Sequence, residues 1–141
     1  MLVEIYHGIL SMEETTLKNS GRLNLTIGEV HLIECVGKEI EGLTIREIAE
    51  AMAIKSPSVT VAVKKLETKG FLEKWPGKKD GRVVLVHLTK EGQQVYEYHR
   101  YYHRMMAQEI SEDLTEEEKA VLIKTLDKLN QYFKKSIGEK I

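Results

Sequence analysis

TIREIAEAMAIKSPSVTVAVKKLETKGFLEKWPGKKDGRVVLVHLT, residues 44–89, is the stretch that decides the fold. Apolar residues at helical spacing predict two helices, over 45–52 and 57–69, joined by a short link. Two runs rich in β-branched and aromatic residues follow, at 71–75 and 83–88, and the PGKKDG between them is typical of a turn. Two short helices followed by a hairpin predict a winged helix-turn-helix.

Local signals at the helix ends support this interpretation. A threonine followed three residues later by glutamate predicts a capping box, in which each side chain pairs with a backbone N–H of the first turn. Ser56 before Pro57 predicts another helix start, with Ser56 as the N-cap, and Gly70 predicts a left-handed C-cap. The capping-box pattern occurs at Thr26–Glu29, Thr44–Glu47 and Thr115–Glu118.

Further helices are expected on both sides of this stretch, over about 2–19, 27–39, 89–110 and 115–137. The fold class is therefore mainly α with a small β-hairpin. We predict one domain over 1–141, with a DNA-binding winged helix at about 26–90 and dimerisation helices at about 1–20 and 90–138. The longest apolar run is too short to span a bilayer, Cys35 is the only cysteine, and the N-terminus carries no basic leader. These features favour a cytoplasmic protein without a membrane partner.

The formal net charge of −1 conceals a strong polarity along the chain. Residues 55–90 contain nine basic and three acidic residues, a charge of +6, whereas the rest of the chain carries −7. The basic window coincides with the second helix of the motif and the hairpin, so double-stranded DNA is the expected partner. The alternative is a winged helix used for protein–protein contact only, which has no reason to concentrate lysine on these two elements.

Small hydroxyl side chains at the start of the second helix allow close approach to base edges and phosphates in a major groove. Lysines further along can reach phosphates, and Arg82 at the hairpin tip can enter a minor groove with Asp80 orienting its guanidinium. The predicted DNA contacts are Thr44, Ser56, Pro57, Ser58, Thr60, Val61, Lys64, Lys65, Lys78, Lys79, Asp80 and Arg82. The sequence contains no glycine-rich phosphate loop, nucleophile elbow or metalloprotease motif, so an enzyme is not expected.

Several of these segments together resemble the multiple antibiotic resistance regulator (MarR) family. They are Leu43-Thr44 with Ile48-Ala49, Val59-Thr60 through Leu72, and Asp80-x-Arg82 followed by Leu88-Thr89-x-x-Gly92. The similarity covers nearly the whole chain and is nearest to the branches that repress fatty-acid synthesis genes or respond to zinc. It implies an obligate homodimer on a near-palindromic operator, acting as a transcriptional repressor whose affinity is set by a small effector. Val61 departs from the basic residue found there in many members, and it suits a thymine methyl group.

The terminal helices give the dimer separate support, because each carries an apolar stripe that must be covered. In the last helix the stripe consists of Leu122, Leu126, Leu129, Tyr132, Phe133 and Ile137. A chain of this length could fold these helices onto its own core, but a two-fold DNA site favours interlocked termini from two copies.

A metal site is the final candidate. His99 and His103 lie four residues apart on the predicted long helix, so one ion could contact both imidazoles. Glu13 and His31 match, by position, the remaining ligands of the three-histidine, one-glutamate pattern of the zinc-responsive repressors. A second metal site of those relatives is not matched, because Asn19, Val30 and Tyr98 stand in its positions. The fatty-acid branch shares the histidines, so a buried polar cluster beside an acyl-binding cavity is the alternative to Zn²⁺.

Overall fold

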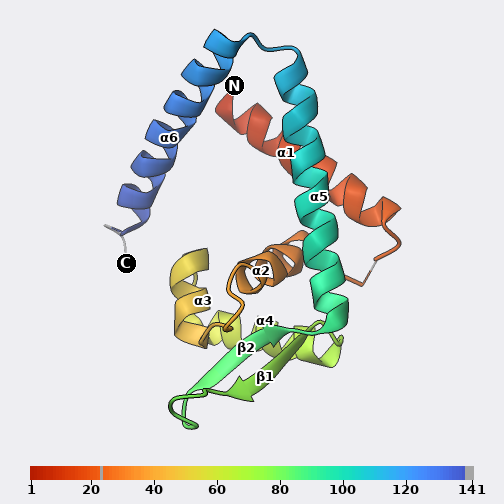
Figure 1. Ribbon diagram of the computed structural model, residues 1–141, viewed down its shortest axis with the longest axis vertical. Coiled ribbons are helices and arrows are strands. Elements are labelled where there is room, and N and C mark those ends of the chain that lie inside the picture. Colours follow the sequence, from red (N-terminus) through yellow and green to blue (C-terminus); the bar gives the residue numbers. More distant parts are fainter. Residues whose placement is uncertain (23, 139–141) are drawn as a thin grey trace. The chain divides into compact units, whose positions relative to one another are not determined.

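The computed structural model describes residues 1–22 and 24–138, which contain six helices and a two-stranded antiparallel sheet (Figure 1). The chain forms two compact units, residues 1–99 and 100–141, and the division falls within one continuous helix, α5. In chain order the elements are α1 (Leu2–Asn19), α2 (Ile27–Gly37), α3 (Ile45–Met52), α4 (Ser56–Thr68), β1 (Leu72–Pro76), β2 (Val84–Leu88), α5 (Lys90–Glu112) and α6 (Glu116–Gly138). This order confirms the predicted fold class.

The helix starts follow the local sequence signals with one exception. Both hydrogen bonds of the capping box are present at Thr26, Thr44 and Thr115. Ser56 was expected to be the N-cap of α4, and this is wrong: α4 begins at Ser56, and its N-cap is Lys55, without a capping side chain. The reason is that Lys55, with φ −76° and ψ 143°, has the extended backbone of an N-cap, whereas Ser56 is already helical.

The hairpin is in register from Leu72 opposite Leu88 to Pro76 opposite Val84, and a bridge between Leu43 and Val86 joins it to the chain before α3. The start of α5 packs directly behind it. The Thr89 hydroxyl donates to the Gly70 carbonyl at 2.6 Å, and a Cβ on Gly92 would lie 2.1 Å from the Phe71 carbonyl oxygen. Glycine is therefore required at 92, and the first turn of α5 is fixed against the end of α4 and the start of β1.

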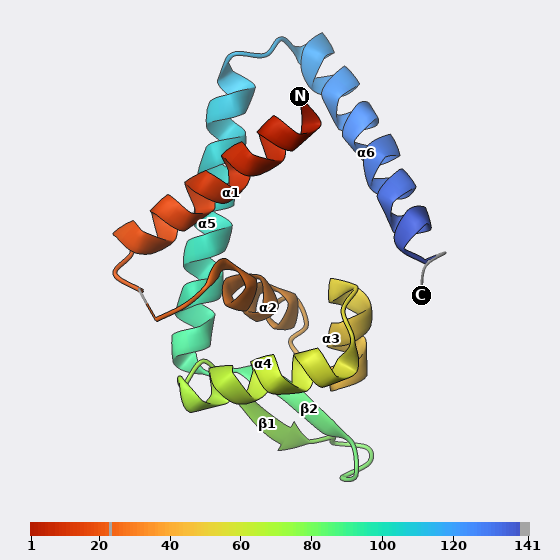
Figure 2. The same cartoon turned by 180° about the vertical axis from the view of Figure 1, so that it is seen from behind.

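The core lies where α2, α3, α4 and the hairpin meet (Figure 2). Val59, Val63 and Leu66 on α4 are completely buried, so one face of this helix contributes to the core and the opposite face is left in solvent. The other large, fully buried side chains are Leu32, Ile33, Val36, Ile48 and Val86. No helix within the described ranges is long and apolar enough to cross a membrane.

The terminal helices bury little of their own surface in the single chain. Among the described residues, Glu13 is the only buried residue of α1, and α6 has none. Exposed large apolar side chains include Leu2, Ile5, Tyr6 and Ile9 on α1, and Leu122, Leu126, Tyr132, Phe133 and Ile137 on α6.

Candidate functional site

The outward face of α4 carries most of the predicted DNA contacts. Ser56, Pro57, Ser58, Thr60, Val61, Lys64 and Lys65 are all at least partly exposed. Val61 keeps 59% of its surface in solvent although its neighbours Val59 and Val63 are buried, because it points away from the core. A hollow of about 600 Å³ lies between the start of α2 and this helix, lined by Gly28, Pro57, Val61 and Lys65 among others. α4 therefore presents small hydroxyl groups at its first turn and cations farther along.

Thr44 has a structural role that accounts for its position before α3. Its hydroxyl accepts the Glu47 backbone N–H at 3.2 Å and donates to the Glu47 carboxylate at 3.0 Å. A contact between Thr44 and DNA stays a prediction.

The lysines of the basic window divide into two groups. Three are paired within the molecule: Lys69 Nζ lies 2.8 Å from Glu29 and also donates to the Asn24 carbonyl, Lys74 lies 2.9 Å from Glu67, and Lys78 lies 3.6 Å from Glu41. Lys64, Lys65 and Lys79, by contrast, have no carboxylate within ion-pair distance among the described residues. The sequence could not separate the groups, because the partners of Lys69 and Lys78 are distant along the chain.

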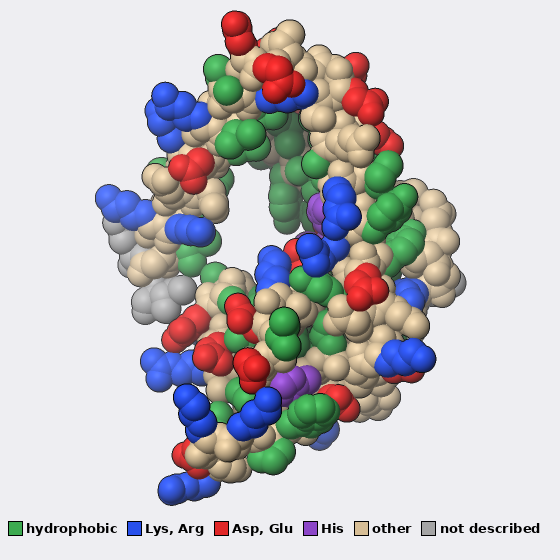
Figure 3. Space-filling model, in the orientation of Figure 1, with side chains coloured by type: hydrophobic (Ala, Val, Ile, Leu, Met, Phe, Trp, Pro, Cys, Tyr) green, Lys and Arg blue, Asp and Glu red, His purple; other side chains and the backbone are tan. Residues whose placement is uncertain are grey.

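Arg82 lies at the tip of the hairpin and projects into solvent, with 95% of its side chain exposed. Asp80 Oδ1 accepts the Arg82 backbone N–H at 3.0 Å and lies 3.5 Å from Nε of the guanidinium. The carboxylate can therefore orient the arginine without burying it. Lys and Arg side chains also gather over the hairpin end of the molecule in Figure 3.

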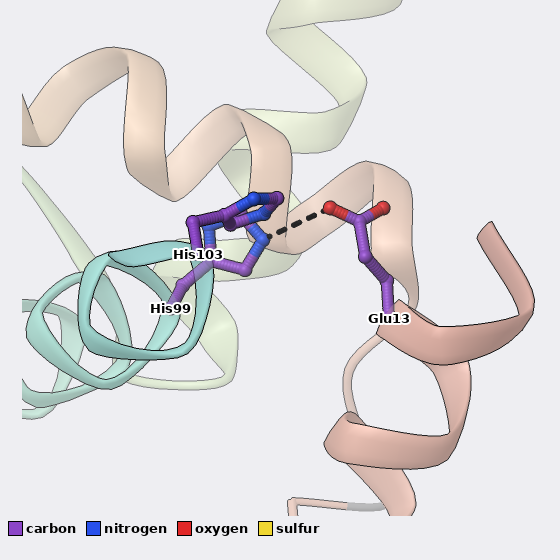
Figure 4. A group of neighbouring side chains, drawn as sticks. All are labelled: Glu13, His99 and His103. Atoms are coloured by element: carbon purple, nitrogen blue, oxygen red, sulfur yellow. Dashed lines mark hydrogen bonds and ion pairs between the residues drawn. The ribbon is translucent and has the colours of Figure 1, made fainter. Parts of the chain in front are cut away.

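Three of the four predicted metal ligands form one group. Oxygen or nitrogen atoms of Glu13, His99 and His103 lie within 4.8 Å of one another (Figure 4), and His103 follows His99 by one turn of the continuous helix α5. Glu13 and His99 are 5% and 7% exposed, and Nε2 of His99 lies 3.3 Å from Glu13 Oε1. Imidazole nitrogen and carboxylate oxygen are ordinary ligands of zinc, so the donor set fits this ion.

His31 contacts the same carboxylate from α2. Its Nε2 lies 3.2 Å from Glu13 Oε2, and its ring centre is 5.7 Å from that of His99. It is not one of the three residues whose donor atoms lie together, and its side chain is 40% exposed. The structure thus places His31 at the solvent side of the cluster.

Glu34 is a member of the cluster that the sequence did not reveal. Its Oε2 lies 3.0 Å from Nδ1 of His99, on the ring edge opposite Glu13, and its Oε1 lies 3.3 Å from Lys38 Nζ. The spacing of His31 and Glu34, one helical turn apart on α2, was the one available signal. This spacing alone did not indicate a contact with His99, because the sequence does not show that α5 passes beside α2.

The ionisation of this cluster follows from its contacts. The close contact with Nδ1 of His99, 3.0 Å from Glu34 Oε2, lowers the pKa of Glu34 to about 2, opposed by burial and helped by the charge of Lys38. Burial favours the neutral form of His99, but the carboxylates of Glu34 and Glu13 outweigh it and raise the pKa of this imidazole. The group therefore pairs a buried imidazole with a carboxylate on each side.

Comparisons with known proteins agree with this architecture. The family model described as MarR family matches residues 25–84. The chain is 30% identical over 115 residues to the transcriptional regulator ZitR of Lactococcus lactis subsp. cremoris, covering 79% of this chain and 78% of ZitR. It is 28% identical over 97 residues to the uncharacterised HTH-type transcriptional regulator YhjH of Bacillus subtilis, and that match spans 69% of this chain but only 55% of YhjH.

Among solved structures, Streptococcus pneumoniae FabT in complex with DNA superimposes with a TM-score of 0.90 at 32% identity, covering 95% of this chain and 93% of FabT. ZitR and YhjH are named as transcriptional regulators, which agrees with the expectation that this chain is not an enzyme. The matching family model, the identity to ZitR and the winged helix-turn-helix together show that the chain belongs to the MarR family of DNA-binding transcriptional regulators.

Proposed function

We propose that this chain is a cytoplasmic, homodimeric repressor that binds a near-palindromic operator, and that a zinc ion sets its operator affinity. The observation that carries the DNA-binding part is the division of α4 into two faces. Val59, Val63 and Leu66 are buried, while the hydroxyl groups and lysines of the opposite face remain open to a partner. The similarity to FabT, whose structure contains DNA, supports the same use of this face.

The test is selection of bound sequences from a random duplex library, followed by titration of the enriched site and a scrambled duplex. We expect enrichment of a near-palindrome and binding at least about 10³-fold tighter than to the scrambled duplex. Binding to neither duplex, even at low salt, would favour a winged helix that contacts only proteins.

The dimer is supported by the apolar side chains of α1 and α6. Exposed apolar area on this scale is unusual for a monomer and marks an association surface. A two-fold operator also needs two copies of α4, because one chain supplies one recognition helix.

Zinc as the effector is supported by the donor set of Glu13, His99 and His103, with His31 next to Glu13. Bound zinc would supply a divalent positive charge that residues of two helices bind together, Glu13 on α1 and His99 on α5. A ligand that binds one conformation more tightly than another shifts the population toward it, which is the basis of control of DNA binding.

The zinc proposal is tested by titrating chelator-treated protein with zinc at neutral pH. We expect about one ion per chain with a dissociation constant below micromolar, abolished in His99→Ala and in His103→Ala. The control is His7→Ala, which removes an exposed imidazole from α1 outside the cluster. Wild-type protein that binds zinc no tighter than micromolar would end zinc as the effector.

A second effector class, an acyl chain, is favoured by one observation. A hollow of about 540 Å³ opens beside the cluster, lined by apolar Leu43 and Met52 as well as by His31, Glu34 and Cys35. The test is displacement of a bound fluorescent fatty acid by saturated fatty acids. If the protein shows this displacement and fails to bind zinc, then the effector is an acyl chain that binds in this hollow.

A further inference from the structure

We infer that Glu34 is a positioning residue of the metal centre: its carboxylate keeps a proton on Nδ1 of His99, so that the lone pair of Nε2 faces the ion. This inference rests on the zinc site proposed above and names a residue outside its ligand set.

The geometry separates the two edges of the imidazole. Nδ1 of His99 lies 3.0 Å from Glu34 Oε2, and Nε2 lies 3.3 Å from Glu13 Oε1, on the side where His103 also approaches. A neutral imidazole carries one proton, and the nitrogen without it is the metal ligand. A carboxylate beside Nδ1 favours the proton there, which leaves Nε2 able to bind on the Glu13 side.

Glu34 is suited to orient His99 rather than to bind the ion itself. Both of its carboxylate oxygens are engaged, Oε2 with His99 and Oε1 with Lys38 at 3.3 Å. It also touches the edge of the ring that faces away from Glu13. Lys38, the C-cap residue of α2 four positions later, in turn holds the carboxylate in place.

α2 therefore has two functions at the metal centre. His31 contacts Glu13 directly, and Glu34, one helical turn later, contacts His99. Partners of this kind fix the ring orientation and increase the basicity of the ligating nitrogen, and removing them lowers metal affinity about 10- to 100-fold.

The test compares zinc affinity, measured by competition with a chromogenic chelator, across a set of variants. Glu34→Gln keeps an oxygen beside Nδ1 but removes the charge, so we expect affinity to fall about 10-fold; Glu34→Leu removes both, and we expect a fall nearer about 100-fold. Glu39→Gln is the matched control, since Glu39 is an exposed carboxylate lining the same hollow, and its affinity should stay within about 2-fold of wild type.

A second readout distinguishes positioning from general disruption of structure. Long-range ¹⁵N–¹H correlation spectra of the zinc-loaded protein should show His99 protonated on Nδ1 and metal-bound through Nε2, and Glu34→Leu should weaken or mix this tautomer pattern. Should the Glu34 variants fail to fold, Lys38→Met, which leaves Glu34 in place without its cation, should lower zinc affinity in the same direction by a smaller factor.

The outcomes separate the two proposals. A wild-type chain that binds no zinc overturns the zinc effector and this inference together. Tight wild-type binding that is unchanged in Glu34→Leu, or a His99 bound to the metal through Nδ1, overturns the inference alone and leaves the zinc effector standing.

Discussion

Arg82 and Asp80 form the smallest unit of the proposed DNA interface. The guanidinium is almost fully exposed, and the carboxylate beside it contacts both its Nε and its backbone N–H. We expect Arg82→Ala to weaken operator binding by about 1–3 kcal/mol, because the substitution removes the charge and the side chain that we predict to enter the groove. Asp80→Ala should cost less, since it loosens the arginine without removing it. Both are measured by fluorescence anisotropy on the operator.

Arg46→Ala is the control for this pair of variants. Arg46 is also exposed and also paired with a carboxylate, Glu50 at 3.1 Å, but it lies on α3 outside the predicted contacts. If Arg82→Ala weakens binding no more than Arg46→Ala does, then the hairpin tip adds only general positive charge.

At the level of the element, the lysines of α4 and the hairpin form two groups. One group has no carboxylate partner among the described residues and is available to DNA, and the other is paired with carboxylates of the same chain. Changing Lys64, Lys65 and Lys79 together to glutamine should flatten the slope of log affinity against log salt by roughly 2–3, near 0.9 for each phosphate that is no longer neutralised. The matched variant changes Lys69 and Lys74, which have carboxylate partners and lie outside the predicted DNA contacts. An equal change of slope per lysine in the two variants would show that the position of these lysines does not matter.

Lys69 connects two elements, and its removal should be visible in stability. It contacts Glu29 at the start of α2 from the end of α4, where 12% of the Glu29 side chain and 30% of the Lys69 side chain remain exposed. We expect Lys69→Met to lower the free energy of unfolding by about 1 kcal/mol at neutral pH. The measurement is urea denaturation followed by circular dichroism.

The same ion pair gives a pH dependence. Burial would raise the pKa of Glu29, but the hydrogen bond from Lys69, with the Thr26 backbone N–H, lowers it below its ordinary value of 4.5. A lowered pKa means that the contribution is fully present above 4.5 and disappears as the pH falls through the folded-state value. The stability difference between wild type and Lys69→Met should therefore shrink in acid, and a difference that persisted far below pH 4.5 would contradict this assignment.

The sequence predicted those elements whose causes are local. Thr26 and Glu29 are three residues apart, so their capping box could be read directly and is present. The second partner of Glu29 is Lys69, forty residues away, and no spacing rule connects them. Glu34 was missed for the same reason, since its contact with His99 exists only after α2 and α5 have packed. Ser56 was misplaced by one residue because the backbone at Lys55 decides where α4 starts.

At the scale of the whole molecule, the exposed apolar side chains of the terminal helices predict that two copies of the chain associate. Leu126 and Phe133 on α6 are 53% and 50% exposed in the single chain, so replacing both with aspartate removes little of its own packing. We expect this double variant to sediment as a monomer while wild type sediments as a dimer, and to bind the operator more weakly as a consequence. Lys124→Asp with Lys128→Asp places the same acidic groups outside the apolar stripe, and it should remain dimeric. A wild-type monomer at micromolar concentration would refute the interface.

The tight packing of Gly92 against the Phe71 carbonyl has a mechanical consequence. No side chain separates the first turn of α5 from the start of β1, so the two are held in direct contact. His99 lies seven residues along α5 from Gly92, about 10 Å at about 1.5 Å per residue, so a sideways displacement of about 1 Å at His99 corresponds to a tilt of roughly 5°. Because the first turn of α5 is held against the hairpin, we expect such a tilt to be passed on to the base of the wing.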